Sequence, residues 1–205
     1  MPTLHSLALF VAAGLALNIT PGPDMLYVAA RGASEGRPAG VVSALGIGAG
    51  TLVHIALVAA GLAAVLAAVP VAYLAIRLGG AGYLIYLGVR ALLSKSTTTA
   101  APLAPASLGA IFRQGVITNV LNPKVALFFL AFLPQFVDPS RGNPALQVIG
   151  LGLLFNTTGT LVNLAVAIGS SSAAERLRAP GVWLQRVTGG IFVALGLRLA
   201  FAARK

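Results

Sequence analysis

Apolar residues dominate six long stretches of the chain, and polar residues gather between them. Each stretch is long enough to cross a bilayer, which requires about 20 predominantly apolar residues in a helix. The stretches are Leu4–Ala30, Ala39–Leu66, Val71–Leu93, Val116–Val137, Leu146–Ile168 and Val182–Ala203. This pattern predicts an all-α integral membrane protein with six transmembrane helices.

The overall composition agrees with this class. Hydrophobic residues make up 58% of the chain and charged residues only 9%, whereas soluble domains carry about 25% charged residues. The net charge of +10 comes mostly from basic residues at the ends of the apolar stretches, which is typical of membrane topology and not of nucleic-acid binding. The absence of cysteine excludes disulfides, thiolate metal sites and thiol redox chemistry.

The distribution of basic residues between the connectors predicts an orientation. With six spans, the connectors on one side hold eight basic residues, and the opposite side holds three. The positive-inside rule then places both chain termini outside and the eight-charge connectors in the cytoplasm, although the basic C-terminus argues against this. The N-terminal segment Met1–Ser6 lacks the positive region of a signal peptide, so we expect the first stretch to remain as a spanning helix.

The two halves of the chain resemble each other. The stretch Gly50–Gly61 matches Gly159–Ser170, and Gly82–Leu92 matches Gly190–Ala200, at spacings of 109 and 108 residues. Each half has three spans, so the second half must be inverted relative to the first, as in many secondary transporters. The predicted organisation is a first three-helix repeat at 1–93, a Thr/Ala/Pro-rich linker at 94–110 and a second three-helix repeat at 111–205.

The first and fourth spans each contain a polar segment with proline. Proline inside a helix costs about 3 kcal/mol, and irregular backbone at membrane depth is tolerated only where it is buried in protein or lines a water-filled cavity. Helices that begin at Pro23 or Pro123 would also attract an anion such as a carboxylate. We therefore predict two inverted repeats whose first and fourth helices are broken at proline. The predicted substrate-binding residues are Asn18, Thr20, Pro21, Gly22, Pro23, Asp24, Asn119, Asn122, Pro123 and Lys124.

Asp24 and Lys124 are the charged residues nearest to the two breaks, and they have opposite signs. They would hold a zwitterion if Asp24 bound its ammonium group and Lys124 its carboxylate, and a mutual ion pair that opens on binding would serve equally well. The alternative is that both extend to water at the membrane interface. Asp24 and His54 are the candidates for proton coupling. A lone histidine in this position more often forms a hydrogen bond with a neighbouring helix.

Other classes of function fit less well. The chain has four acidic residues, no two in one span, whereas an intramembrane protease needs paired acids or a nucleophile with a base. We therefore expect no enzymatic activity. Hard metal ions need several oxygen ligands and softer ones favour His or Cys, so we expect no metal site and no cofactor. An exporter of metal ions or other small metabolites, and a passive channel, are the alternatives to an amino-acid exporter.

Three motifs resemble a known family. They are "TPGP" at Thr20–Pro23, the glycine pattern from Gly36 to Gly50, and "NVLNPKVALFFLAFLPQF" at Asn119–Phe136. They look like the LysE-type translocators, most closely the RhtB branch, which exports neutral amino acids such as homoserine, threonine or leucine. The resemblance covers nearly the whole chain and implies efflux from the cytoplasm driven by the proton gradient. The positions that match the family's motifs are Pro21, Gly22, Pro23, Asn122, Pro123 and Lys124.

These expectations describe a multi-pass protein of the plasma (inner) membrane of a bacterium. It would export small amino acids or their derivatives by proton antiport. The expected partners are the amino-acid substrate, protons and the lipid bilayer, with no nucleic acid. The chain's 24 glycines offer many faces for close helix packing, so a homodimer is compatible with the sequence, which leaves the oligomeric state open.

Overall fold

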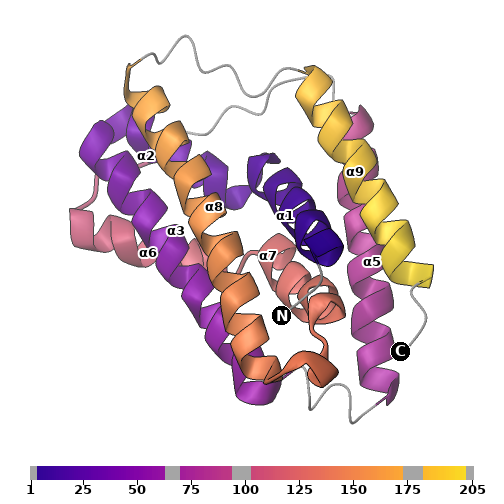
Figure 1. The fold of residues 1–205 in the computed structure, drawn as a ribbon. Coiled ribbons are helices and arrows are strands. Elements are labelled where there is room, and N and C mark those ends of the chain that lie inside the picture. Colours follow the sequence, from indigo (N-terminus) through magenta and orange to yellow (C-terminus); the bar gives the residue numbers. More distant parts are fainter. Residues whose placement is uncertain (1–3, 63–69, 94–102, 173–181, 202–205) are drawn as a thin grey trace.

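The computed structural model describes residues 4–62, 70–93, 103–172 and 182–201, and these residues form helices and connecting turns without a strand (Figure 1). The main helices are α1 (Leu4–Ile19), α2 (Pro23–Glu35), α3 (Arg37–Leu57), α5 (Pro70–Leu93), α6 (Leu108–Val120), α7 (Pro123–Leu127), α8 (Pro144–Ser172) and α9 (Val182–Phe201). The short segments are the π-helical turns η1 (Val58–Leu62) and η2 (Phe128–Phe132) and the 3₁₀ turns η3 (Leu133–Phe136) and η4 (Pro139–Arg141).

Proline and glycine set several helix boundaries. Pro23 and Pro123 lie in the first turn of α2 and α7, where the missing N–H would have no partner within the helix and the fixed φ favours helix entry. Gly36 separates α2 from α3 with a φ of 83°, a conformation that side chains with a Cβ rarely adopt. The helix α6 begins at Leu108, inside the segment that we expected to be a linker, because Ser107 caps it by accepting a hydrogen bond from the N–H of Ala110.

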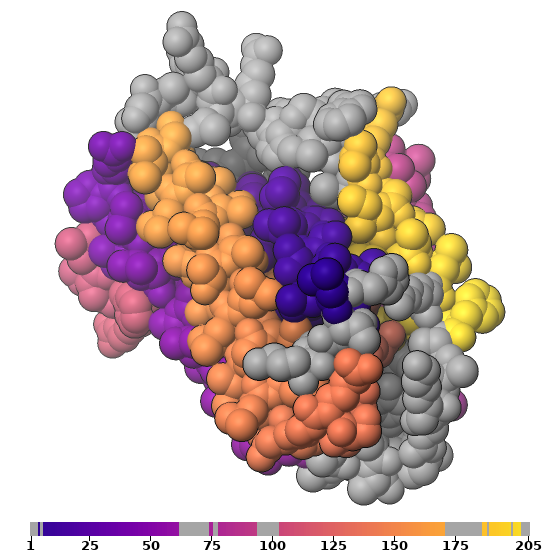
Figure 2. Space-filling model, in the orientation of Figure 1, coloured from indigo at the N-terminus to yellow at the C-terminus, as the bar shows by residue number. Residues whose placement is uncertain are grey.

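The helices form a larger group and a separate pair (Figure 1). In the larger group α3 packs against α6 and α8, and α2 packs against α3 and α8. The pair consists of α5 and α9, which approach closely because Gly88 and Gly189 face each other across the contact. The helix α1 lies between the two groups and contacts both α8 and α9, and Figure 2 shows α8 between α3 and α1 on one face of the molecule.

A cluster of phenylalanine rings fills the core between α1, α8 and the segment after α7. That segment cannot continue as a regular α-helix at Pro134, which has no N–H to donate, and the chain passes instead through η2 and η3. The rings of Phe128 and Phe155 stack with their centroids 4.5 Å apart. The buried rings of this cluster are Phe10, Phe128, Phe129, Phe132, Phe136 and Phe155.

The outward faces of the long helices are apolar, as a bilayer requires. Two helices, Arg37–Gly61 and Pro144–Ser170, are long and apolar enough to cross a membrane, and the number rises to four if each of two bent pairs counts as one span. The bent pairs are Ser6–Ile19 with Pro23–Glu35 and Leu108–Val120 with Pro123–Phe136. Six spans in inverted repeats remain a prediction, because the described parts of the remaining two stretches contain shorter apolar helices, Leu78–Leu93 and Gly189–Phe201.

Candidate functional site

The two predicted breaks are present, and they lie beside each other. The axis of the chain bends by 48° between α1 and α2 and by 46° between α6 and α7. Lys124, in the first turn of α7, joins them: its ammonium group donates hydrogen bonds to the carbonyl oxygens of Leu17 and Thr20, each at 3.0 Å. The proline segments of the two halves of the chain therefore form one structural unit.

Lys124 caps the C-terminal end of α1. The last carbonyl groups of a helix have no partner within the helix and carry partial negative charge, and the buried ammonium group supplies both donors and a positive charge. Gly22 leaves room for it, because a Cβ on Gly22 would lie 3.1 Å from Nζ. The backbone of Gly22 is extended, with a φ of −158°, so this position favours glycine for space and not for backbone conformation.

Asn122 and Thr20 stabilise the broken ends of the helices. The side chain of Asn122 accepts a hydrogen bond from the backbone N–H of Lys124 at 3.0 Å and so caps α7. The hydroxyl of Thr20 donates to the carbonyl oxygen of Ala16 at 2.6 Å. Of the three prolines at the breaks, Pro23 and Pro123 are exposed and Pro21 is half-buried. These predicted residues shape the breaks and do not line the cavity described below.

Asp24 and Asn119 form a second connection between the two broken segments. Asp24 lies in the first turn of α2 and is 8% exposed, and the amide of Asn119 donates to its Oδ2 at 2.8 Å. The other carboxylate oxygen, Oδ1, is buried and has no hydrogen-bond partner among the described residues. The hydroxyl of Thr51 on α3 donates to Oδ1 of Asn119 at 3.3 Å, so α2, α3 and α6 meet in one polar network.

His54 belongs to the same network without lining the cavity. Its Nε2 lies 3.2 Å from the backbone carbonyl oxygen of Asn119, and because a carbonyl oxygen only accepts hydrogen bonds, Nε2 carries the hydrogen. The imidazole also stacks on Phe129, with ring centroids 5.7 Å apart. The hydrogen bond to a neighbouring helix, which was the alternative for His54, is therefore present. Asn119 contacts both candidates for proton coupling, Asp24 and His54.

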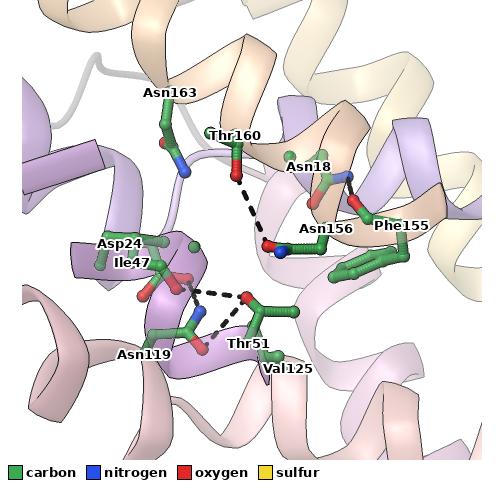
Figure 3. A pocket seen from close by; sticks show the side chains of 12 residues that line it. Asn18, Asp24, Ile47, Thr51, Asn119, Val125, Phe155, Asn156, Thr160 and Asn163 are labelled. Carbon is green, nitrogen blue, oxygen red and sulfur yellow. Dashed lines mark hydrogen bonds between the residues drawn. The ribbon is translucent and has the colours of Figure 1, made fainter. Parts of the chain in front are cut away.

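A polar cavity opens where the breaks meet α3 and α8 (Figure 3). It is small: its free volume of about 20 Å³ is enough for a water molecule but far below the roughly 300–1,000 Å³ of typical small-molecule pockets, so this conformation has no room for an amino acid. Asp24 is the one ionisable residue among the described residues that line it. The lining residues are Asn18, Asp24, Ile47, Gly48, Thr51, Asn119, Val125, Phe155, Asn156, Gly159, Thr160 and Asn163.

Three of these residues were predicted from the sequence, and the others were not. Asn18, Asp24 and Asn119 were predicted, and Asn18 also donates to the hydroxyl of Thr158 and to the carbonyl oxygen of Phe155 at 3.1 and 3.3 Å. The contribution of α8 was missed, although Asn156, Thr160 and Asn163 recur at spacings of four and three residues. Such spacing on an otherwise apolar helix marks one polar face, and that signal was available in the sequence.

A second polar cluster ties the far end of α2 to the start of α6. Arg31 is buried and forms an ion pair with Glu35, and it donates to the carbonyl oxygen of Ala104 at 2.8 Å and to the side chain of Gln114 at 2.7 Å. Glu35 accepts in turn from the N–H of Ala106 at 2.9 Å. Through these contacts the segment that leads into α6 is fixed to α2. The described residues contain no group of three His, Cys, Asp or Glu side chains that could hold a metal ion.

Comparison with known proteins places this architecture in a family. The family model described as LysE type translocator matches residues 15–203. An uncharacterized membrane protein of Pseudomonas aeruginosa is 32% identical over 193 residues, which cover 90% of this chain and 89% of that protein. An uncharacterized membrane protein of Vibrio cholerae is 28% identical over 202 residues, which cover 97% of this chain and 98% of that protein.

A relative with a named activity matches a shorter part of the chain. The leucine efflux protein of Salmonella typhimurium is 32% identical over 131 residues, which cover 63% of this chain and 62% of that protein. No solved structure matches. Because the family model spans most of the chain and the helices are apolar enough to cross a bilayer, this multi-pass bacterial membrane protein belongs to the LysE type translocator family.

Proposed function

We propose that this protein is a secondary transporter that exports small amino acids or their derivatives from the cytoplasm by proton antiport. The observation that carries the proposal is the buried Asp24, which lies in the wall of the cavity between two broken helices and whose Oδ1 has no hydrogen-bond partner in the part of the chain that the structure describes. A buried carboxylate without a full set of partners is costly. A bound proton or a bound ammonium group would remove that cost, and the two would compete for the same oxygen.

Competition for Asp24 provides a mechanism of antiport. On the cytoplasmic side the ammonium group of an amino acid replaces the proton on Asp24, and on the outside a proton replaces the amino acid. Asn119 holds the carboxylate in place through its hydrogen bond to Oδ2 and connects it to His54 through its backbone carbonyl. The cavity would alternate between the two sides as two inverted three-helix repeats move against each other about the breaks.

The family and its relatives support the choice of substrate. The LysE type translocator model covers most of the chain, and one relative is named as a leucine efflux protein. A neutral amino acid is a zwitterion whose ammonium group suits Asp24. A passive channel is the alternative that the same cavity permits, and it would carry substrate without moving protons.

Efflux from cells tests this function. Cells that express the wild-type protein, Asp24→Asn or Asp138→Asn are loaded with radiolabelled neutral amino acids, and loss of label is followed with and without a protonophore. We expect the wild type to accelerate the efflux of at least one amino acid, the protonophore to abolish the acceleration, and Asp24→Asn to lack it. Asp138 lies outside the cavity in a turn before α8, so Asp138→Asn is the matched control and should export normally.

Two results would contradict the proposal. Acceleration that survives the protonophore would indicate a channel or facilitator. Normal, protonophore-sensitive efflux by Asp24→Asn, at equal amounts of protein in the membrane, would remove Asp24 from the mechanism.

A further inference from the structure

The helix α8 presents a row of neutral polar residues to the cavity. Asn156, Gly159, Thr160 and Asn163 all line it, and their spacing of three, four and seven residues places them on one face of the helix. Their side chains include two amides and one hydroxyl, each with at least one hydrogen-bond donor. The outward face of α8 is mainly apolar, with Leu153, Leu161 and Ile168 exposed, and it also carries Thr157.

The donors of this row are largely unused. Asn163 is 8% exposed, and no hydrogen bond joins its side chain to another of the described residues. The contact between the Thr160 hydroxyl and Oδ1 of Asn156, at 3.5 Å, is at the limit of hydrogen-bond distance. An amide that faces a cavity and has no partner in the protein keeps its donors and its acceptor free for a ligand. These side chains are therefore positioned to bind something that enters the cavity.

The row faces the acidic part of the cavity. Figure 3 shows Thr160 and Asn163 projecting from α8 toward the side where Asp24 lies, with the cavity between them. A ligand carboxylate is repelled by Asp24 and attracted by donors, so it belongs on the α8 side. Lys124, the residue that the sequence suggested for this role, directs its ammonium group to the carbonyl oxygens of Leu17 and Thr20 and does not line the cavity.

We infer that the neutral row on α8, with Asn163 as its best placed member, is the subsite that binds the carboxylate of the substrate. The inference rests on the proposed function, in which Asp24 binds the ammonium group. Neutral donors suit a substrate that must be released on each cycle, because they bind the carboxylate through hydrogen bonds without adding the attraction between two opposite charges. Two glycines, which have no side chain, leave space beside the polar groups of the cavity: a Cβ on Gly48 would lie 2.8 Å from the Thr160 hydroxyl, and a Cβ on Gly159 would lie 2.9 Å from Oδ1 of Asn18.

A pair of ligands that differ only in the carboxylate tests this subsite. Purified wild-type protein, Asn163→Asp and Thr157→Ala are assayed for displacement of radiolabelled leucine by unlabelled leucine and by leucinamide, which has no carboxylate. The assay is run at pH 6.5, where the α-amino groups of both ligands carry a proton. Thr157 is on the exposed side of α8 and serves as the matched control.

The new charge in Asn163→Asp would repel the substrate's carboxylate but not the amide. We expect the concentration of leucine needed for half displacement to rise at least tenfold in Asn163→Asp, with a change of less than threefold for leucinamide and for both ligands in Thr157→Ala. Binding of leucinamide with near normal affinity also shows that the variant is folded. If radiolabelled leucine binds too weakly to Asn163→Asp, radiolabelled leucinamide is used in its place, and its displacement by unlabelled leucine and by unlabelled leucinamide is compared.

The outcomes separate this inference from the proposed function. Equal changes for the two ligands, or no change for either, would overturn the carboxylate subsite and leave amino-acid binding in place. Failure of the wild-type protein to bind leucine or any other amino acid, under conditions where it remains folded, would overturn the proposed function and this inference with it.

Discussion

Replacing Lys124 with methionine should separate the two broken helices. The substitution keeps a long side chain but removes the ammonium group that donates to two carbonyl oxygens at the end of α1, both at 3.0 Å. Hydrogen bonds from charged groups contribute about 1.5–3 kcal/mol each, and the carbonyls would remain buried without partners. Removing a buried charge recovers part of its desolvation cost, so we expect the free energy of unfolding to fall by about 3 kcal/mol in total.

Thermal unfolding in detergent measures this loss. For a chain of this length, 1 kcal/mol corresponds to a shift of about 2–4 °C in Tm, so Lys124→Met should unfold about 6–12 °C below the wild type. Arg113 is exposed on α6, and Arg113→Met removes the same charge without a buried contact, so its Tm should stay within about 2 °C of the wild type.

Transport by the same variant provides a second measurement. Because Lys124 holds α7 against the end of α1, we expect Lys124→Met to insert into the membrane but to lose efflux. A Tm equal to that of the wild type, together with normal efflux, would refute the conclusion that Lys124 joins the two breaks. A lower Tm with normal efflux would confine its role to stability.

Two further predictions concern the helix pair and a turn outside the spans. Gly88→Val should lower Tm by about 2–12 °C, since a Cβ there would lie 2.7 Å from the Gly189 carbonyl oxygen and overpacking costs about 1–3 kcal/mol. Gly82→Ala is the control and should not lower Tm, because a Cβ on Gly82 would meet nothing within 4 Å. The hydroxyl and N–H of Ser140 hold the pKa of Asp138 below its ordinary value of 3.8, so Ser140→Ala should raise that pKa, as followed by NMR titration. A carboxyl pKa that is lower in the folded protein than in the unfolded chain stabilises the folded state at pH values above the unfolded-state pKa, and this stabilisation is lost on acidification. Any Tm advantage of the wild type over Ser140→Ala should therefore shrink below a pH of about 4.

The sequence predicted the breaks because they violate local rules. Proline and polar residues within an apolar stretch exclude a continuous helix, and the structure bends at both predicted segments. The helical class followed from composition in the same way. The start of α6 at Leu108 was not predicted, since the segment before Val116 has no long apolar run and its helix depends on capping by Ser107.

The roles of individual side chains were harder to predict than their location. Lys124 and Asp24 are near the breaks, as expected. The sequence alone does not show that the ammonium group is directed to α1, or that Oδ1 of Asp24 has no hydrogen-bond partner within the described ranges. Those facts depend on the three-dimensional approach of α1, α2, α6 and α7. The predicted internal repeat pairs Asn163 with His54, yet Asn163 lines the cavity and His54 packs on Phe129, so the repeat did not predict the surroundings of either side chain.

The central claim is that substrate movement is coupled to a proton at Asp24. The most direct test loads proteoliposomes with a neutral amino acid such as leucine and a pH-sensitive dye, and then dilutes them into buffer without the amino acid. Antiport predicts that the interior acidifies as the amino acid leaves, and that proteoliposomes with Asp24→Asn show no such change. Release of the amino acid without acidification would contradict proton antiport, and equal acidification with Asp24→Asn would contradict the role of Asp24 in it.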